Sequence, residues 1–536
     1  MIVMFSLFIL CKGAAAMNND GVFFGLFRQG APANINLITD FENKYGKKVS
    51  MIMWYQDYSC PFPTQDCDIV WNHGAVPQIV WEPWIWGEDE SKQINLDAII
   101  SGKWDNYIKE WAKGAKDWGK PVFVRWAHEF NIIDYPWSIE KNGKDPAKYV
   151  AAWRHVIKIF RNTGATNVKW IWCYMRESWP QEDWNDYEKA YPGDEFVDWI
   201  GIDGYNWGTT QSWSKWQSMV DLFRTPARFA WKRFSSKPIM IAEFAATEKG
   251  GNKADWIKSM PAELKLMPYI KAVLWFDLKK EASWQIASSP ASEKAFKEIM
   301  KNSYFITGKD NLLDALPMAV ISTPKKTCIA KKTNKVTING NLSEWSSVSS
   351  IQINSKEQVQ EGLSTWKGPS DCSGDIKVMW DDNNMYIAAR IVDNVPFNVF
   401  TKNADIWNAD CLELVFSANQ EADSERTYFE FNDLQLGISP GNGKNINPSV
   451  WIWSRNKLAE GAKVVSKRFD KGYILEASIP WKTLRNFAPA SGVLTGFDAA
   501  IDDSDGKTRK TQMVWNGDFM FYKDPSVWGV IKFLSQ

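Results

Sequence analysis

Two glutamates each follow a short apolar run, and a pair of carboxyl groups in that setting can cleave a glycosidic bond. Glu129 follows the apolar part of residues 121–131, PVFVRWAHEFN, and Glu243 follows that of residues 237–246, KPIMIAEFAA. In a barrel of parallel strands, the carboxyl ends of the strands open into the active-site mouth. One carboxyl group there can protonate the leaving oxygen while the other attacks the sugar carbon. We therefore predict that both glutamates are catalytic.

The neighbours of Glu129 allow a simpler interpretation of the same stretch. Arg125 stands four residues before Glu129, and such pairs commonly form ion pairs at the start of a helix. His128 could likewise be a single buried imidazole that is satisfied by a backbone carbonyl. The second carboxylate, Glu243, in the same kind of setting favours chemistry over these structural roles.

The chain offers no pattern for a catalytic metal. It has three histidines, and no two of them have the spacing of paired metal ligands. We therefore expect no metal at the catalytic centre and no cofactor for catalysis.

Eight apolar runs separated by helical patterns predict the barrel that would position the glutamates. The runs are short and nearly unbroken, which is typical of strands buried on both faces. One helix begins with Asp145 as its cap and Pro146 in its first turn, and Gly164 ends it. This alternation indicates the α/β class and a (β/α)8 barrel over residues 17–306. The expected strands are residues 22–27, 49–54, 77–81, 121–126, 168–173, 197–202, 238–242 and 270–276, and the other expected helices are residues 102–118, 211–234, 252–266 and 292–302.

Composition argues for a neutral, ring-shaped ligand. Lys plus Arg equal Asp plus Glu at 63 each among 536 residues, so no net charge favours nucleic acid or an anionic membrane. The 32 tryptophans offer rigid apolar faces that suit stacking on sugar rings, although most must pack the core. We expect a polysaccharide as partner, no membrane span and a monomer.

The N-terminal segment predicts export. Residues 1–16, MIVMFSLFILCKGAAA, form a short apolar run with a small-residue exit, which is typical of a secretory signal cleaved near Ala16. A start at Met17 would instead leave a cytosolic protein. In an oxidising compartment, Cys60 and Cys67 are close enough in sequence to form a disulfide. The prediction is a secreted protein, extracellular or periplasmic.

Residues 18–304 resemble glycoside hydrolase family 26, a family of retaining β-glycanases on a (β/α)8 barrel. The resemblance rests on WEP at 81–83, on RWAHEFN at 125–131 and on YPGD at 191–194, which leads into VDWIGIDGYN at 197–206. It continues with Glu243 and with Trp275 on the expected eighth strand. Together, in order and at the strand ends, these motifs form a specific pattern.

The resemblance implies a role for each matching residue. Glu129 resembles the acid/base and Glu243 the nucleophile, while His128 matches the histidine beside the acid/base. Tyr205 matches a tyrosine that hydrogen-bonds the nucleophile, and Trp275 resembles the aromatic floor of the subsite that holds the cleaved sugar. Three further residues are added as candidates for binding the substrate: Arg125, Trp81 and Trp137.

The loop after the acid/base candidate leaves the substrate open. Mannan-cleaving relatives usually carry a Gly after their His-Glu-Met-Asn and an aromatic run resembling Trp-Phe-Trp-Trp, whereas this chain continues as IIDYPW over residues 132–137. The expected function is a retaining endo-β-glycanase acting on a β-1,4-linked polysaccharide, with β-mannan first. Mixed-linkage β-1,3-1,4-glucan is the alternative. A non-catalytic glycan-binding protein is a further alternative.

The last third of the chain has a different pattern. Residues 307–334 contain Pro317, Pro324 and a lysine-rich stretch without helical periodicity, which predicts a linker. After it, short alternating runs such as residues 376–380, 385–391 and 473–479 are separated by turn residues. They predict an all-β sandwich over residues 335–536.

This sandwich region resembles a family 9 carbohydrate-binding module. The motifs that carry the resemblance are INGNLSEW at 338–345, IWNADCLE at 406–413, GYILEASIPW at 472–481 and SVWGV at 526–530. Such modules can clamp a sugar between tryptophans, and we predict Trp407 and Trp515 for this role. The resemblance also implies structural calcium, for which the acidic turns at 381–384 and 502–506 are candidates.

Overall fold

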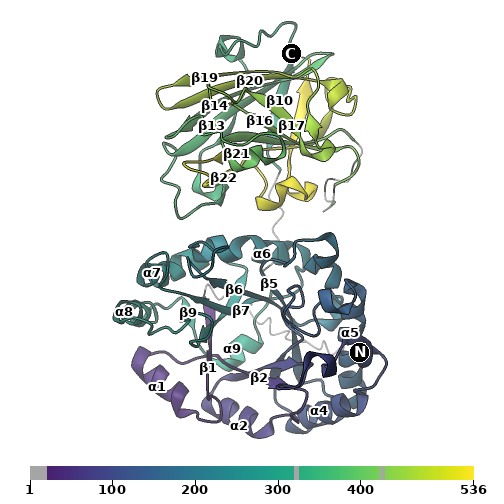
Figure 1. Cartoon of the computed structure of the whole chain (residues 1–536), viewed down its shortest axis with the longest axis vertical. Helices are drawn as coiled ribbons and strands as arrows, with labels where there is room; N and C mark the ends of the chain where they lie inside the picture. Colours follow the sequence, from purple (N-terminus) through teal and green to yellow (C-terminus); the bar gives the residue numbers. More distant parts are fainter. Residues whose placement is uncertain are drawn as a thin grey trace, which may run out of the picture. The chain divides into compact units, whose positions relative to one another are not determined.

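The computed structural model of the chain describes residues 21–318, 325–420, 422, 424, 426 and 429–535 (Figure 1). They form two compact units, one on each side of residues 319–324. The predicted export segment, residues 1–16, lies outside the described residues. Within the part of the chain that is described, no helix combines the length and apolar character needed to cross a membrane.

The first unit is a closed barrel of eight parallel strands with helices around it (Figure 1). Neighbouring strands pair in sequence order, and β1 pairs with both β2 and β8, which closes the ring. The short β9, Phe305–Ile306, adds to β1. The predicted barrel is thereby confirmed. Its strands are β1 Val22–Arg28, β2 Met51–Asp57, β3 Val76–Glu82, β4 Val122–Trp126, β5 Val168–Met175, β6 Trp199–Asn206, β7 Ile239–Ala246 and β8 Ile270–Asp277.

One connection of the barrel departs from the predicted alternation. Three short 3-10 turns follow β5 in place of an α-helix, at Asp183–Asn185, Tyr187–Ala190 and Asp194–Phe196. Residues 211–218, which the sequence placed in a helix, form a loop before α6. The α-helices of this unit are α1 Asn36–Tyr45, α2 Thr64–His73, α3 Leu96–Ile100, α4 Asp105–Trp118, α5 Pro146–Thr163, α6 Met219–Arg233, α7 Lys253–Leu264, α8 Pro290–Ile299 and α9 Lys309–Leu313.

Side-chain alternation along the strands decides which residues reach the barrel interior. Successive side chains of a strand point to opposite faces. On β4, Arg125 bonds to residues of β6 and β7 across the interior, whereas Trp126 packs on Tyr149 and Trp153 of α5. Polar side chains therefore lie inside the barrel, and the aromatic side chains next to them on the strand pack against the surrounding helices.

The second unit is a sheet that curls over its own apolar core. Its longest path runs β18-β17-β16-β15-β21-β23-β10-β13-β14-β20-β19, and the predicted sandwich is thereby confirmed. The strands are β10 Thr327–Lys332, β11 Ile351–Ile353, β12 Val359–Glu361, β13 Cys372–Trp380, β14 Asn384–Asp393, β15 Cys411–Ser417, β16 Asp433–Ser439, β17 Ser449–Ile452, β18 Lys457–Leu458, β19 Lys463–Phe469, β20 Gly472–Pro480, β21 Leu494–Asp503, β22 Thr511–Val514 and β23 Gly529–Leu534.

Two predictions about the covalent and linker structure need correction. Strand β10, Thr327–Lys332, and helix α9, Lys309–Leu313, both lie in the region predicted as a linker. The strand belongs to the sheet because β23 and β13 pair on either side of it. Cys60 and Cys67 are both free thiols, so the suggested disulfide is not formed.

Candidate functional site

Glu243 lies at the mouth end of β7, where three donors converge on its carboxylate. Arg125 and Tyr55 donate to Oε1, the tyrosine at 2.5 Å, and Tyr205 donates to Oε2 at 2.5 Å. The side chain is buried. An ionised carboxylate accepts and never donates hydrogen bonds, so three donors without a competing acceptor suit the anion. Tyr205 thus makes a hydrogen bond to Glu243, the residue that the resemblance implied as its partner.

Arg125 is enclosed within the barrel, with no exposed surface. Its Nη1 donates to both oxygens of Asp203, at 2.8 and 2.9 Å, and its Nη2 donates to Glu243. The predicted contact between Arg125 and substrate is therefore wrong, because protein groups cover the side chain. The simpler interpretation, an ion pair with Glu129 at the start of a helix, is wrong too, because Arg125 pairs with Asp203 on β6 and Glu243 on β7.

Glu129 sits in a strained backbone segment just after β4. Ala127 and Glu129 have φ values of 46° and 50°, a region that residues other than glycine seldom adopt. Hydrogen bonds hold the segment from several sides: the Ala127 carbonyl accepts from Tyr149 at 3.0 Å, and the Glu129 amide donates to the Cys173 carbonyl at 3.0 Å. Such strain persists only where the surroundings fix it, and it is common at functional sites.

The electrostatic setting keeps a proton on Glu129. Burial raises the pKa of its carboxyl well above the usual range, and the negative charges of Asp203 and Glu243 raise it further while Arg125 opposes them. Burial also raises the pKa of Asp203 to about 7, although Arg125 opposes that shift. A carboxyl group that stays protonated near neutral pH can serve as an acid.

His128 stands between the two strained residues with its ring buried. Burial lowers the pKa of the imidazole well below its ordinary value, and the charges of Arg125 and Lys280 add to the effect, so the ring is neutral. Its Nδ1 has no hydrogen-bond partner among the described residues. Tyr135 packs on the ring at 5.0 Å and stacks on Trp137 at 4.5 Å. The Tyr-Pro-Trp loop therefore borders the acid/base candidate.

Three tryptophans predicted to contact the sugar are fully buried. Trp81 stacks on Trp111 of α4 at 4.3 Å, and Trp275 packs on Phe296 of α8 and on Trp256 of α7. Both rings face the helices because they alternate with interior residues on β3 and β8, so these two predictions are wrong. Trp137 is enclosed as well, and its Nε1 donates to the His128 carbonyl at 2.7 Å. Through this hydrogen bond Trp137 fixes the Tyr-Pro-Trp loop to the backbone of His128.

Sequence reasoning missed several residues of the mouth. Tyr55 directly follows the expected second strand, and Asp203 stands inside the quoted motif at 197–206, yet neither was selected. Trp284 lies in the loop after β8 and packs on Tyr205 at 4.9 Å. Glu82 ends β3. Burial raises the pKa of its carboxyl to about 7, although hydrogen bonds from Trp84 and Trp86 oppose that shift. A period-two reading of the strands would have pointed to Tyr55 and Glu82.

In the second unit, one of the two predicted tryptophans is at the surface. Trp407 is 40% exposed, and the guanidinium of Arg509 lies 5.0 Å from the centre of its ring. Arg509 forms ion pairs with Glu361 and Asp502 beneath that ring. Trp515 is only 5% exposed and packs in the core, so its prediction as a sugar clamp is wrong.

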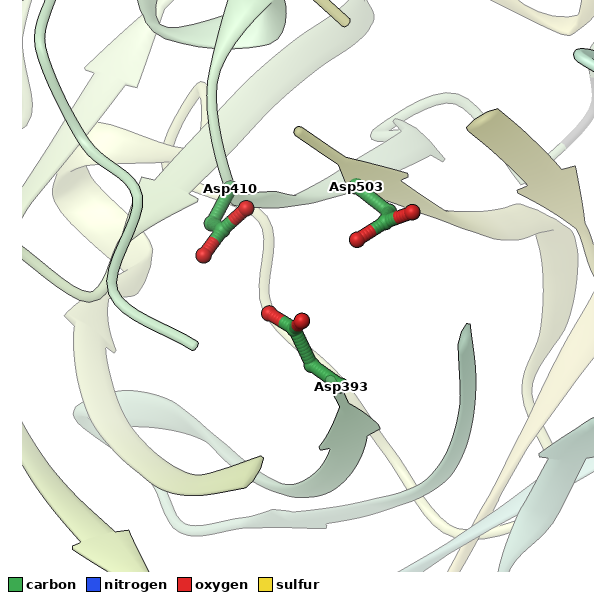
Figure 2. Close-up of side chains that lie close together, drawn as sticks. All are labelled: Asp393, Asp410 and Asp503. Carbon is green, nitrogen blue, oxygen red and sulfur yellow. The ribbon is translucent and has the colours of Figure 1, made fainter. Parts of the chain in front are cut away.

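Three buried aspartates of the second unit face one another (Figure 2). Asp393 ends β14, Asp410 precedes β15 and Asp503 ends β21, and each offers a carboxylate oxygen within 4.8 Å of the others. Both carboxylate oxygens of Asp503 lack a hydrogen bond, and Lys510 is 3.9 Å away. Burial and the charge of Asp393 raise the pKa of Asp503 to about 8. A divalent cation would relieve this repulsion.

The sequence also indicates the acidic turn at 381–384 for calcium. In that turn both carboxylate oxygens of Asp381 already accept hydrogen bonds from the protein. The Oδ1 atom of Asp381 accepts from the backbone amides of Asn383 and Asn384, and its Oδ2 accepts from Tyr386 at 2.7 Å. The other predicted turn, 502–506, contributes Asp503 to the three-aspartate cluster.

Known proteins resemble this chain in both units. Residues 88–242 match the model named Glycosyl hydrolase family 26, and residues 338–535 match the model named Carbohydrate family 9 binding domain-like. Endoglucanase H of Acetivibrio thermocellus is 38% identical over 291 residues, which are 52% of this chain and 30% of that protein. Endo-1,4-beta-xylanase A of Thermoanaerobacterium saccharolyticum is 25% identical over 179 residues, 33% of this chain and 13% of that protein.

A solved GH26 beta-mannanase from Bacteroides ovatus is 18% identical, with a TM-score of 0.42 and coverage of 55% of this chain and 92% of that one. The two family matches confirm the predicted resemblances, one to family 26 and one to the family 9 module. The family 26 match includes Glu129 and ends one residue before Glu243. The chain spans less than a third of the length of either curated relative.

The buried ion pairs of Arg125 predict a pH-dependent loss of stability. Arg125→Met leaves Asp203 and Glu243 without their cation, and breaking a buried pair costs roughly 3–5 kcal/mol of unfolding free energy. Burial already raises the folded-state pKa of Asp203, and losing the opposing charge of Arg125 raises it further above the unfolded value. The loss therefore grows as pH rises and shrinks on acidification. Urea unfolding of the barrel unit at neutral and mildly acidic pH measures this.

The matched control is Lys92→Met, which removes the exposed ion pair between Lys92 and Glu88. An exposed pair contributes about 1 kcal/mol or less, so this variant should stay close to the parent at both pH values. An Arg125→Met chain as stable as the control variant would contradict the assigned network.

Proposed function

We propose that this chain is a retaining glycoside hydrolase that cleaves internal bonds of a β-glycan, with Glu129 as acid/base and Glu243 as nucleophile. The observation that carries the proposal is the contrast between two buried carboxyl groups at the mouth. Glu129 retains a proton through burial and nearby negative charge, whereas Glu243 is held by three donors. Environments that separate two carboxyl groups in this way assign the acid and the anion.

The proposed reaction has two displacements. In the first, Glu129 gives its proton to the glycosidic oxygen as the Glu243 carboxylate attacks the anomeric carbon, which releases the leaving sugar and forms a glycosyl ester. In the second, the Glu129 carboxylate takes a proton from water, and the hydroxyl oxygen attacks the anomeric carbon and frees Glu243. Arg125, Tyr55 and Tyr205 position the nucleophile, and the neutral His128 offers Nδ1 to a sugar hydroxyl.

Among substrates, we propose β-glucan first and β-mannan second, which reverses the order expected from the sequence. The relative Endoglucanase H is 38% identical, and its name describes a glucan-cleaving protein. The Tyr-Pro-Trp loop beside His128, which departs from the mannan-cleaving pattern, supports the same choice. The deciding measurement is kcat/KM on lichenan, a mixed-linkage glucan, against mannan. Turnover on neither, nor on laminarin or xylan, would favour the non-catalytic alternative.

Separate variants distinguish the two glutamates. Glu243→Ala should abolish turnover and keep binding, because no other group forms the covalent intermediate. Glu129→Ala should lower turnover of polysaccharide by about a hundred- to ten-thousandfold. It should retain slow turnover of aryl glycosides with activated leaving groups, and azide should accelerate that reaction. Release of the aryl group and glycosyl azide formation measure both effects.

The exposed carboxylate of Glu110 on α4 provides the control. Glu110→Ala should keep parental activity. Full activity in Glu243→Ala, or azide rescue of neither glutamate variant, would overturn the assigned roles.

We propose that the second unit binds the same class of glycan at Trp407. The exposed ring can stack on a pyranose face, and the buried polar groups beneath it can bond to hydroxyls. Asp502 Oδ2 and Gln512 Oε1 are buried without hydrogen-bond partners, which leaves two acceptors for a ligand. A tethered binding unit raises the local concentration of the enzyme at an insoluble polymer.

Trp407→Ala should weaken retention on insoluble β-glucan by about tenfold, because stacking and its buried area are lost. Hydrolysis of soluble oligosaccharides should not change. Phe431→Ala is the matched control, since Phe431 is a more exposed aromatic residue of the same unit, packed on Arg485. Equal retention by the parent chain and Trp407→Ala would exclude this site.

We propose that the three aspartates hold a structural calcium ion. The residues fit a hard divalent cation, because three carboxylates converge and both oxygens of Asp503 lack hydrogen bonds. When bound, the ion would supply charge neutralisation that joins the ends of β14 and β21 to the start of β15. It takes no part in the reaction at the barrel.

Calcium at about a hundred times its Kd should stabilise the second unit by about 2.7 kcal/mol and raise its melting temperature. Asp503→Asn should abolish that rise. Without calcium, this variant should be no less stable than the parent near neutral pH, because a pKa of about 8 already keeps a proton on Asp503 and Asn is a neutral side chain of similar shape. Asp381→Asn, in the internally bonded turn, should respond to calcium as the parent does. Identical melting of the parent chain in calcium and in chelator would refute the proposal.

Action on an external polymer supports export, and we propose a secreted, monomeric protein. The apolar residues 1–16, with their small-residue exit, support export. N-terminal sequencing of the exported protein tests whether this segment is removed.

A further inference from the structure

The loop between β6 and α6 carries the most exposed tryptophan among the described residues of the first unit. Trp213 has 70% of its surface exposed. An isolated exposed tryptophan on a surface needs no special explanation. This ring, however, is connected to Glu243 by ring contacts and one hydrogen bond.

The connection runs through two further tryptophans and one tyrosine. Trp213 packs on Trp207 at 5.6 Å between ring centres, and Trp207 packs on Trp284 at 4.8 Å. Trp284 packs on Tyr205 at 4.9 Å, and the Tyr205 hydroxyl donates to Glu243. The series therefore begins at the proposed nucleophile and ends at an exposed indole.

Hydrogen bonds fix the loop that presents Trp213. Ser214 Oγ donates to the Gly208 carbonyl at 2.7 Å, and Thr210 Oγ1 donates to the Trp207 carbonyl at 2.7 Å. The Thr209 amide donates to the Lys249 carbonyl on the β7–α7 connection. Gly208 is required there, because it has φ of +51° and a Cβ would lie 1.7 Å from that carbonyl oxygen.

The loop that holds Trp284 is fixed as well. The buried Lys253 donates to the Gln285 carbonyl at 2.6 Å and to Ser288 Oγ at 2.9 Å. Asp277 Oδ1 accepts from the Ile286 amide at 2.8 Å. Trp284 itself is buried, so its loop supports Trp207 from within and offers no stacking face. The exposed face is that of Trp213, and a rigid aromatic surface costs little conformational entropy when a ligand stacks on it.

We propose that Trp213 is a distal sugar platform that binds only glycan chains long enough to extend from the carboxylates past Trp207. The proposal rests on the function proposed above and adds a residue that selects for substrate length. Its occupant is a pyranose ring, because the series is aromatic, ends in a broad indole face and leads from a site built for glycosidic bonds.

Binding of short and long ligands tests the proposal. Calorimetry uses the full chain with Glu129→Gln, so that ligand is not consumed, and purified mixed-linkage gluco-oligosaccharides of increasing length. Trp213→Ala should weaken the longest ligand by roughly three- to tenfold and leave the disaccharide unchanged. Trp213→Phe retains an aromatic face and should recover most of the affinity.

If Trp213→Ala weakened the binding of short and long ligands equally, or changed neither, the proposal that Trp213 is a sugar platform would be contradicted. Loss of affinity in Trp213→Phe equal to that in Trp213→Ala would also contradict it, because stacking would then be irrelevant. Turnover by the chain without the Glu129 change is recorded separately. If that chain showed no turnover, the proposed function would be refuted. The dependence of binding affinity on ligand length would still decide whether Trp213 binds sugar.

Discussion

The first unit depends on one buried cation placed between two carboxylates. Arg125 on β4 reaches Asp203 on β6 and Glu243 on β7, with no exposed surface of its own. Those bonds fix the nucleophile candidate and connect three strands across the interior. Burial raises the pKa of Glu129, and the negative charges of Asp203 and Glu243 raise it further against the opposing charge of Arg125. One arrangement thus serves both proposed roles, because the cation holds Glu243 while burial and the two nearby carboxylates keep a proton on Glu129.

Much of this organisation was predictable, and the failures have a common physical cause. Unbroken apolar runs predict strands buried on both faces, and polar residues at their ends predict a mouth. In such runs hydrophobicity alone does not show which face each side chain takes, and only the period of two along the strand does so. Trp81 and Trp275 were therefore assigned to the sugar although they face helices. Tyr55 was passed over because it follows the apparent end of its strand. The partners of Arg125 come from distant strands, and no local spacing reveals them.

The second unit shows a different limit of sequence reasoning. Trp407 and Trp515 are predicted on the same grounds, yet only Trp407 is exposed, whereas Trp515 packs inside. The three aspartates are far apart in sequence and meet only because the ends of β14 and β21 and the start of β15 come together. Of the two acidic turns that the sequence indicates for calcium, the turn at 502–506 supplies Asp503 to the cluster. In the turn at 381–384, Asp381 is satisfied by its own backbone neighbours and Tyr386. The burial of Asp503 with no hydrogen bond to either carboxylate oxygen is a property of the fold that composition does not reveal.

The central claim is that Glu243 forms a covalent bond with the sugar while Glu129 handles the proton. The most direct measurement is to trap that intermediate with a 2-deoxy-2-fluoro gluco-oligosaccharide that carries an activated leaving group. The fluorine slows both displacements, and the good leaving group lets the ester accumulate. Peptide mapping by mass spectrometry should place the added sugar on Glu243 alone. An adduct on Asp203 or Glu82, or an inverted anomer as the first product of normal hydrolysis, would contradict the account.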